Sequence, residues 1–101
     1  MSCSTLKVLV VEDERIVAWE LTERLTRMGH AVCGVAPTGE EAVRAAQDNR
    51  PDLVLMDIML AGPMDGIEAA RSIRSRLGTP VVFCSAYTGE TRARAERLDP
   101  L

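Results

Sequence analysis

Four short apolar runs alternate along the chain with segments of helical periodicity. The runs, rich in valine and leucine, are LKVLVV (6–11), AVCGVA (31–36), DLVLMD (52–57) and PVVFCSA (80–86). Continuous apolar runs of this length are typical of strands that are buried on both faces, as in a parallel sheet. We therefore predict four parallel strands, each covered on both sides.

The segments between the runs carry helix signals. Residues 15–28 repeat apolar side chains at helical spacing and are followed by Gly29, the residue type that a helix C-cap favours. Residues 38–48 open with Thr38 and Glu41, the two positions of a capping box. The repeating apolar residues of the first helix are Val17, Leu21, Leu25 and Met28.

A third helix is predicted over residues 67–77, and a fourth, mostly charged, over 89–98. The residues expected on the inward side of the third helix are Ile67, Ala70, Ile73 and Leu77. Strictly alternating strands and helices indicate right-handed βαβ crossovers. The predicted fold class is therefore α/β, an open parallel sheet with helices on both faces.

Composition narrows the class of protein. A chain of 101 residues that is 47% hydrophobic and 27% charged is typical of one soluble globular domain, spanning residues 1–101. No apolar stretch reaches the ~20 residues that cross a bilayer, and the first residues lack the features of a secretory signal, so we expect a cytoplasmic protein without membrane contact.

Charge and cysteine usage exclude two further classes. The net charge is −3, the arginines are spread over several segments, and only three aromatic residues are present, so direct nucleic-acid binding is not expected. Cys3, Cys33 and Cys84 form no CxxC pair. They are predicted to be small, reduced core residues, neither disulfide-bonded nor zinc-binding.

Acidic residues follow two of the predicted strands. Glu12 and Asp13 come after the first run, Asp57 ends the third, and Ser85 lies at the end of the fourth. Ligands of open parallel sheets bind beyond the carboxyl ends of the strands, where these residues converge. Carboxylates that repel one another are stabilised by a hard divalent cation, and oxygen ligands suit Mg²⁺. The sequence therefore predicts a magnesium site at this rim.

Each residue also has a purely structural interpretation. The acids at 12–14 would favour the dipole of the following helix as a solvated turn. Asp57 would bond its own backbone in a turn at the strand end, and Ser85 alone carries almost no information. The metal site is favoured because strand ends assigned independently from the apolar pattern bring all of these residues to one edge.

Five segments resemble the receiver domain of two-component response regulators. They are VLVVEDE, TGEEAV, PDLVLMDIML, MDGIEAA and TPVVFCSA, in the family's order and at its distances. The resemblance implies a flavodoxin-like (CheY-like) fold with strand order 2-1-3-4-5. The last strand and helix of that fold are not expected within this chain, so we predict the order 2-1-3-4 in a single receiver domain that is incomplete at its C-terminus.

The resemblance also implies an activity. A sensor histidine kinase or a histidine phosphotransfer domain would pass a phosphoryl group to Asp57 in a Mg²⁺-dependent reaction, so the module would signal and not act as a turnover enzyme. By resemblance Asp13 is the direct metal ligand, Glu12 the second acid, and the backbone carbonyl of Met59 a further ligand. Ser85 resembles the residue that bonds the phosphoryl oxygen and couples phosphorylation to the next loop.

Two departures from the family keep alternatives open. The stretch 58–65 is one residue longer than usual, and the family's lysine at the end of the fifth strand has no counterpart, because Lys7, the only lysine, begins the first strand. A pseudo-receiver that binds partners without phosphotransfer is one alternative. A dehalogenase-like phosphatase is another, although it requires an acid at position 59, where Met59 stands. Without the last strand and helix we also expect homodimers or swapped oligomers.

Overall fold

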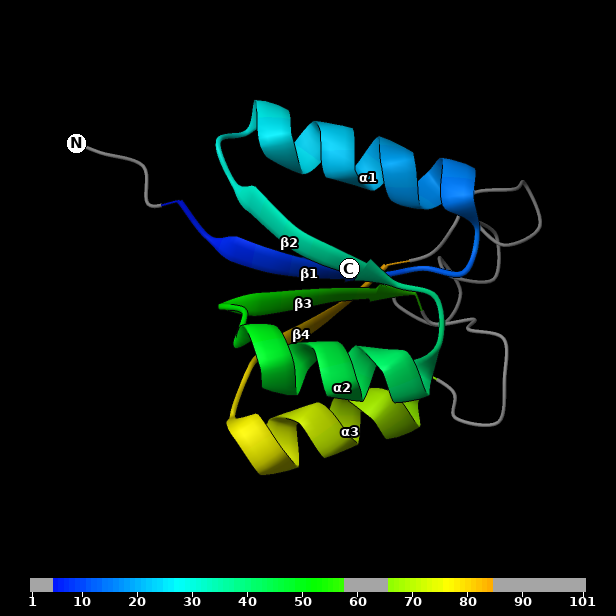
Figure 1. Ribbon diagram of the computed structural model, residues 1–101, viewed down its shortest axis with the longest axis vertical. Coiled ribbons are helices and arrows are strands. Elements are labelled where there is room, and N and C mark those ends of the chain that lie inside the picture. The colour runs from blue at the N-terminus through cyan, green and yellow to red at the C-terminus, as the bar shows by residue number, and fades with distance from the viewer. Residues whose placement is uncertain (1–4, 58–65, 85–101) are drawn as a thin grey trace, which may run out of the picture.

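The computed structural model describes residues 5–57 and 66–84, in which strands and helices alternate (Figure 1). Strand β1 spans Lys7–Val11, β2 Ala31–Ala36, β3 Leu53–Asp57 and β4 Val81–Cys84. Helix α1 spans Arg15–Arg27, α2 Gly39–Asn49 and α3 Gly66–Leu77. Within the described ranges, the elements predicted from the apolar pattern are confirmed, with boundaries that differ by at most one residue.

The strands form one parallel sheet in the order β2-β1-β3-β4. Both the α/β class and the predicted order 2-1-3-4 are confirmed. The first strand of the chain is therefore central, with Val11 opposite Ala36 of β2 and opposite Met56 of β3. Because all four strands run the same way, their carboxyl ends lie along one rim of the sheet.

Helices cover both faces of the sheet: α1 lies on one side, and α2 and α3 lie together on the other (Figure 1). Alternate residues of β1 supply the two cores, as the pleat requires. Val8 and Val10 pack with Ala18 of α1. Leu9 and Val11 belong to the larger core, which includes Ala42 of α2 and Ile73 of α3. This anchoring fixes where β1 ends, and with it the residues that follow.

The helix boundaries lie where capping residues in the sequence indicated. The Thr38 hydroxyl oxygen accepts a hydrogen bond from the Glu41 N–H at 3.2 Å, as a capping box requires. Gly29 and Gly78 follow α1 and α3 with φ of 94° and 72°, a left-handed conformation that costs glycine little. Both glycines therefore turn the chain back toward the sheet.

Burial on both faces was predicted for all four strands, and this is wrong for the two outer ones. Val35 of β2 is 49% exposed, and Val82 and Phe83 of β4 are 48% and 41% exposed. In the described part of the chain, β2 and β4 are the outer strands of the sheet, and each has one strand neighbour. The central strands match the prediction more closely.

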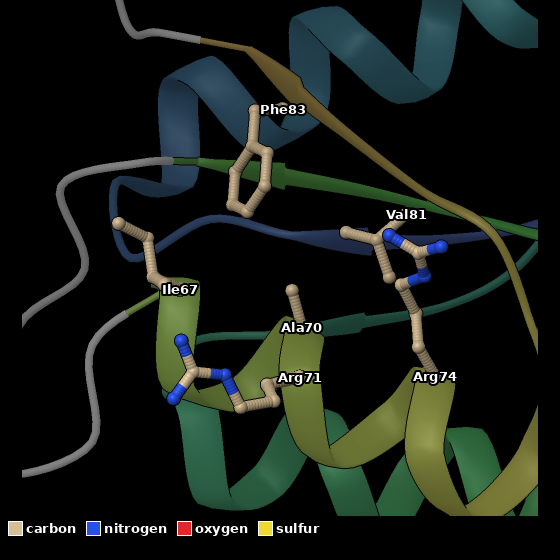
Figure 2. A pocket seen from close by; sticks show the side chains of 6 residues that line it. All are labelled: Ile67, Ala70, Arg71, Arg74, Val81 and Phe83. Atoms are coloured by element: carbon tan, nitrogen blue, oxygen red, sulfur yellow. The ribbon is translucent and has the colours of Figure 1, made fainter.

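The inward position predicted for Ile67 is also wrong, because this side chain is 56% exposed. Gly66, Ala69, Ala70 and Ile73 form the buried stripe of α3, and Ile67 lies one position, about 100°, away from Gly66. Figure 2 shows Ile67 at one end of a hollow of about 330 Å³ between α3 and β4, with Arg71 and Arg74 along α3.

Several predictions concern residues outside the described ranges. They are the stretch 58–65, which is one residue longer than usual and contains Met59, the end of the fourth strand with Ser85, the helix at 89–98, and Cys3. Cys33 and Cys84 are half-buried free thiols. None of the described helices is long and apolar enough to cross a membrane.

Candidate metal centre

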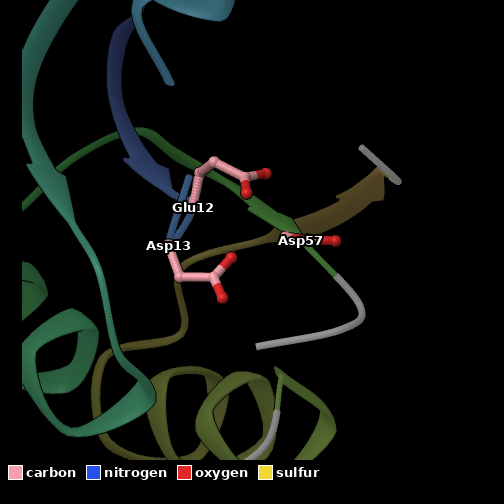
Figure 3. Close-up of side chains that lie close together, drawn as sticks. All are labelled: Glu12, Asp13 and Asp57. Carbon is pink, nitrogen blue, oxygen red and sulfur yellow. The ribbon is translucent and has the colours of Figure 1, made fainter. Parts of the chain in front are cut away.

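Three acids meet at the carboxyl rim because β1 and β3 are parallel neighbours. Glu12 and Asp13 directly follow β1, and Asp57 is the last residue of β3. One carboxylate oxygen from each residue lies within 4.8 Å of those of the other two. Figure 3 shows the three side chains close together where these two strands end. The structure thus brings together the acids that the sequence singled out, from segments more than forty residues apart.

The three carboxylates have different surroundings. Glu12 and Asp57 are each only 2% exposed, whereas Asp13 is open to solvent. Glu12 Oε2 accepts a hydrogen bond from the Glu14 N–H at 3.1 Å. Glu12 Oε1 is buried and has no hydrogen-bond partner among the described residues. A buried acceptor without a donor is costly, so this oxygen favours a cation or a proton beside it.

Burial and like charge change the acidity of this rim. Burial raises the pKa of Glu12 from 4.5 to about 8; the charges of Asp57 and Asp13 act in the same direction, against the hydrogen bond from the Glu14 N–H. Burial also raises the pKa of Cys84 to about 12, with smaller contributions from Asp57 and Glu12. The raised pKa of Glu12 favours a proton on this carboxyl, and a bound cation would compete with that proton.

The donor set fits a hard divalent cation. All three side chains offer carboxylate oxygen, the ligand type of Mg²⁺, and the exposure of Asp13 leaves room for the waters that Mg²⁺ retains. The unpartnered Glu12 Oε1 is an acceptor that such an ion would satisfy. The described residues around the site are thus suited to hold a metal.

Cys84 adjoins the site, whereas Lys7 lies far from it. Cys84 lies directly opposite Asp57 in the pairing of β3 with β4, a neighbour that the sequence analysis did not assign to the site. Its place next to Ser85 in the fourth apolar run was the signal that could have identified it. Lys7 begins β1, whereas the acids follow the end of that strand. The only lysine of the chain therefore lies at the opposite rim, as predicted.

Comparison with known proteins assigns the family. Residues 8–99 match the model of the response regulator receiver domain. The phyllosphere-induced regulator PhyR of Methylorubrum extorquens is 38% identical over 95 residues, which are 93% of this chain and 35% of that protein. The transcriptional regulatory protein PdtaR of Mycobacterium tuberculosis is 39% identical over 82 residues, 81% of this chain and 40% of that protein. The chain thus spans well under half the length of these relatives.

Solved structures agree. The signal receiver domain of a modulated diguanylate cyclase from Desulfovibrio desulfuricans has a TM-score of 0.77 and 42% identity, covering 95% of this chain and 77% of that one. The PhyR receiver domain of Erythrobacter litoralis has a TM-score of 0.77 and 35% identity, covering 94% and 68%. Phosphorylation and Mg²⁺ are typical of such domains, which are signalling modules and not typical turnover enzymes. The chain belongs to the response regulator receiver domain family.

Proposed function

We propose that this domain accepts a phosphoryl group on Asp57 from a histidine kinase or a histidine phosphotransfer domain, with Mg²⁺ held by Glu12, Asp13 and Asp57. The observation that carries the proposal is the convergence of three carboxylates within 4.8 Å, two of them buried, at the ends of adjacent strands. By family resemblance, the backbone carbonyl of Met59 would complete the metal ligands, and Ser85 would contact the phosphoryl oxygen.

The chemistry needs few protein groups. A carboxylate oxygen of Asp57 attacks the phosphorus of a phosphohistidine; the new P–O bond forms an acyl phosphate as the P–N bond breaks, and the ring leaves as neutral imidazole with its proton on the other nitrogen. The position of Asp57 at the end of a fully anchored central strand orients the nucleophile. When bound, Mg²⁺ supplies positive charge against the phosphoryl oxygens.

The direct test is phosphorylation of the 101-residue chain by a small phosphoramidate donor in the presence of Mg²⁺. Intact-mass spectrometry should show the gain of one phosphoryl group, and Asp57→Asn should abolish that gain because its amide is not a nucleophile. Glu20→Gln, a neutralisation on the exposed side of α1, is the matched control and should be phosphorylated like the unchanged chain. Equal phosphorylation of the Asp57→Asn variant would refute the assignment.

One observation favours a second candidate, a module that binds partners without phosphotransfer. Among similar structures, PhyR of Bartonella quintana was crystallised in complex with the anti-sigma factor NepR, so partners of this family are not restricted to kinases. A chain that binds Mg²⁺ but gains no phosphoryl group from any phosphoramidate would support this second function.

A further inference from the structure

The outer edge of β2 is unoccupied by any other part of the described chain. β2 pairs with β1 on one side, and its other side is bonded to no strand or side chain among the described residues. An edge strand presents a row of backbone N–H and C=O groups that can bond an additional strand. The sheet can therefore be extended at this edge.

A largely apolar hollow of about 540 Å³ flanks this edge on the α1 side. Its lining includes the apolar residues Trp19, Val35 and Pro37, and Trp19 is 64% exposed although it lies beside a cavity. At its inner end the hollow reaches Glu12 and Asp13 of the metal centre. At this volume, the hollow has room for an aliphatic side chain larger than valine, which would cover part of the exposed indole.

A second, smaller hollow of about 220 Å³ flanks the same edge on the α2 side. Val35 lines both hollows, so they lie on either side of one strand residue. The charged residues of the smaller hollow are Glu41, Arg44 and Asp48. Two carboxylates against one guanidinium leave it with a net negative charge, which favours a basic side chain.

We propose that the outer edge of β2 binds an extended segment of a partner protein in which apolar and basic residues alternate. Successive side chains of a strand point to opposite faces of the sheet. A strand added to β2 would therefore direct an apolar side chain toward Trp19 and the next, basic one toward Glu41 and Asp48. Backbone hydrogen bonds give such strand addition its affinity, and the two hollows give it sequence preference.

A second copy of the chain fits this edge less well. The β2 segment AVCGVA has no basic residue and no side chain larger than valine. An antiparallel β2–β2 pair would thus leave the Trp19 hollow unfilled and offer no cation to Glu41 and Asp48. These features favour a different protein as the occupant.

Trp19 is the only tryptophan of the chain and reports directly on the larger hollow. The experiment is a fluorescence titration of the 101-residue chain with a short peptide of alternating lysine and isoleucine. We expect a saturable blue shift as the indole leaves water. A peptide of the same composition with its lysines and isoleucines in separate blocks should bind about tenfold more weakly, because it cannot serve both hollows at once.

Val35→Lys should weaken binding of the alternating peptide by about tenfold. It removes the apolar side chain that lines both hollows and adds a positive charge that repels the lysines of the peptide. Met28→Lys is the matched control, because Met28 is 65% exposed and lines neither hollow. It should bind like the unchanged chain. Circular dichroism would verify that both variants are folded.

Three results would overturn the proposal. They are equal affinity for the two peptides, an unchanged affinity in Val35→Lys, and a Trp19 shift that appears without peptide and follows self-association in sedimentation. The last result would assign the edge to a second copy of the chain.

Discussion

Acidic residues at the two ends of the sheet differ in how their carboxylate oxygens are hydrogen-bonded. At the amino end, Asp52 Oδ2 accepts a hydrogen bond from the Lys7 N–H at 2.8 Å, and the Asp52 N–H donates to the Lys7 carbonyl at 2.7 Å. At the carboxyl end, Glu12 is buried beside two other acids, and its Oε1 has no partner among the described residues. Asp52 thus completes the backbone ladder, whereas the other end retains an acceptor for a ligand.

The amino end has a second such contact. His30 Nδ1 accepts a hydrogen bond from the Leu6 N–H at 3.1 Å, next to the backbone bond from the Ala31 N–H to the Leu6 carbonyl. The imidazole therefore continues the pairing of β1 with β2 by one position. The comparison teaches that a polar side chain whose acceptors are used by backbone is part of the framework. A buried acceptor without such a bond indicates a binding site.

Metal removal should have the largest effect, and it should act at the carboxyl end of the sheet and not at the amino end. Chelation of divalent cations should abolish phosphorylation of Asp57, because no cation then neutralises the negative charge of the incoming phosphoryl group beside Asp13. Asp52→Asn, at the other end, should retain phosphorylation when Mg²⁺ is present. Intact-mass spectrometry before and after Mg²⁺ is restored checks both. Undiminished transfer without metal would remove the functional contrast between the two ends.

The pH dependence of stability should come from the carboxyl end. Burial in the folded chain raises the pKa of Glu12 from its ordinary value of 4.5 to about 8. Between these pH values the folded state holds a proton that the unfolded state has released, so raising the pH favours unfolding. Stability should fall by at most about 1.4 kcal/mol per pH unit.

Urea unfolding between about pH 5 and pH 8 measures this slope. Glu12→Gln should flatten it, because the amide does not titrate, and Mg²⁺ should flatten it by favouring the ionised carboxylate. A slope that persists in Glu12→Gln would assign the pH dependence to another group.

The amino end should respond to mutation without regard to metal. Asp52→Ala removes the acceptor of the Lys7 N–H and should lower the free energy of unfolding by about 1 kcal/mol, a modest loss because the contact is exposed. Thermal unfolding with and without Mg²⁺ measures it. The loss should be the same in both conditions; a loss that Mg²⁺ abolishes would show that the two ends are coupled.

The smallest expected effect is at His30. His30→Ala leaves the Leu6 N–H without its acceptor and should cost about 0.5–1 kcal/mol, because solvent can replace part of this half-buried bond. His30→Gln is the matched variant, since its amide oxygen can accept the same hydrogen bond. Equal losses in the two variants would mean that the imidazole contributes by packing and not by the hydrogen bond.

The sequence predicted the carboxyl end better than the amino end. Glu12, Asp13 and Asp57 could be assigned to one rim because each directly follows an apolar run, and parallel strands end together. The burial of Glu12 and its unpartnered oxygen could not be predicted, because they depend on how the rim packs. The contacts of Asp52 and His30 join residues 45 and 24 positions apart, and no local pattern indicates them.

The fold shows the same division. Periodicity identified the helices and strands, and Thr38 identified the start of α2. It did not distinguish outer strands from central ones, so the exposure of Val35 and Phe83 was missed. Periodicity also did not predict the rotation of α3 about its axis. That rotation depends on the packing of two small residues, Ala69 and Ala70, against the core. Burial depends on tertiary contacts, which a single sequence does not reveal.

The central place of β1 has a consequence during synthesis. β1 leaves the ribosome first, yet its neighbours β2 and β3 follow only after residues 31 and 53. Until then its valines and leucine remain uncovered, and the site lacks Asp57 beside Glu12 and Asp13. At translation rates of about 5–20 residues per second, the nascent chain spends a few seconds in that state. The order of strands therefore delays both the burial of β1 and the assembly of the three acids until β3 has been synthesised.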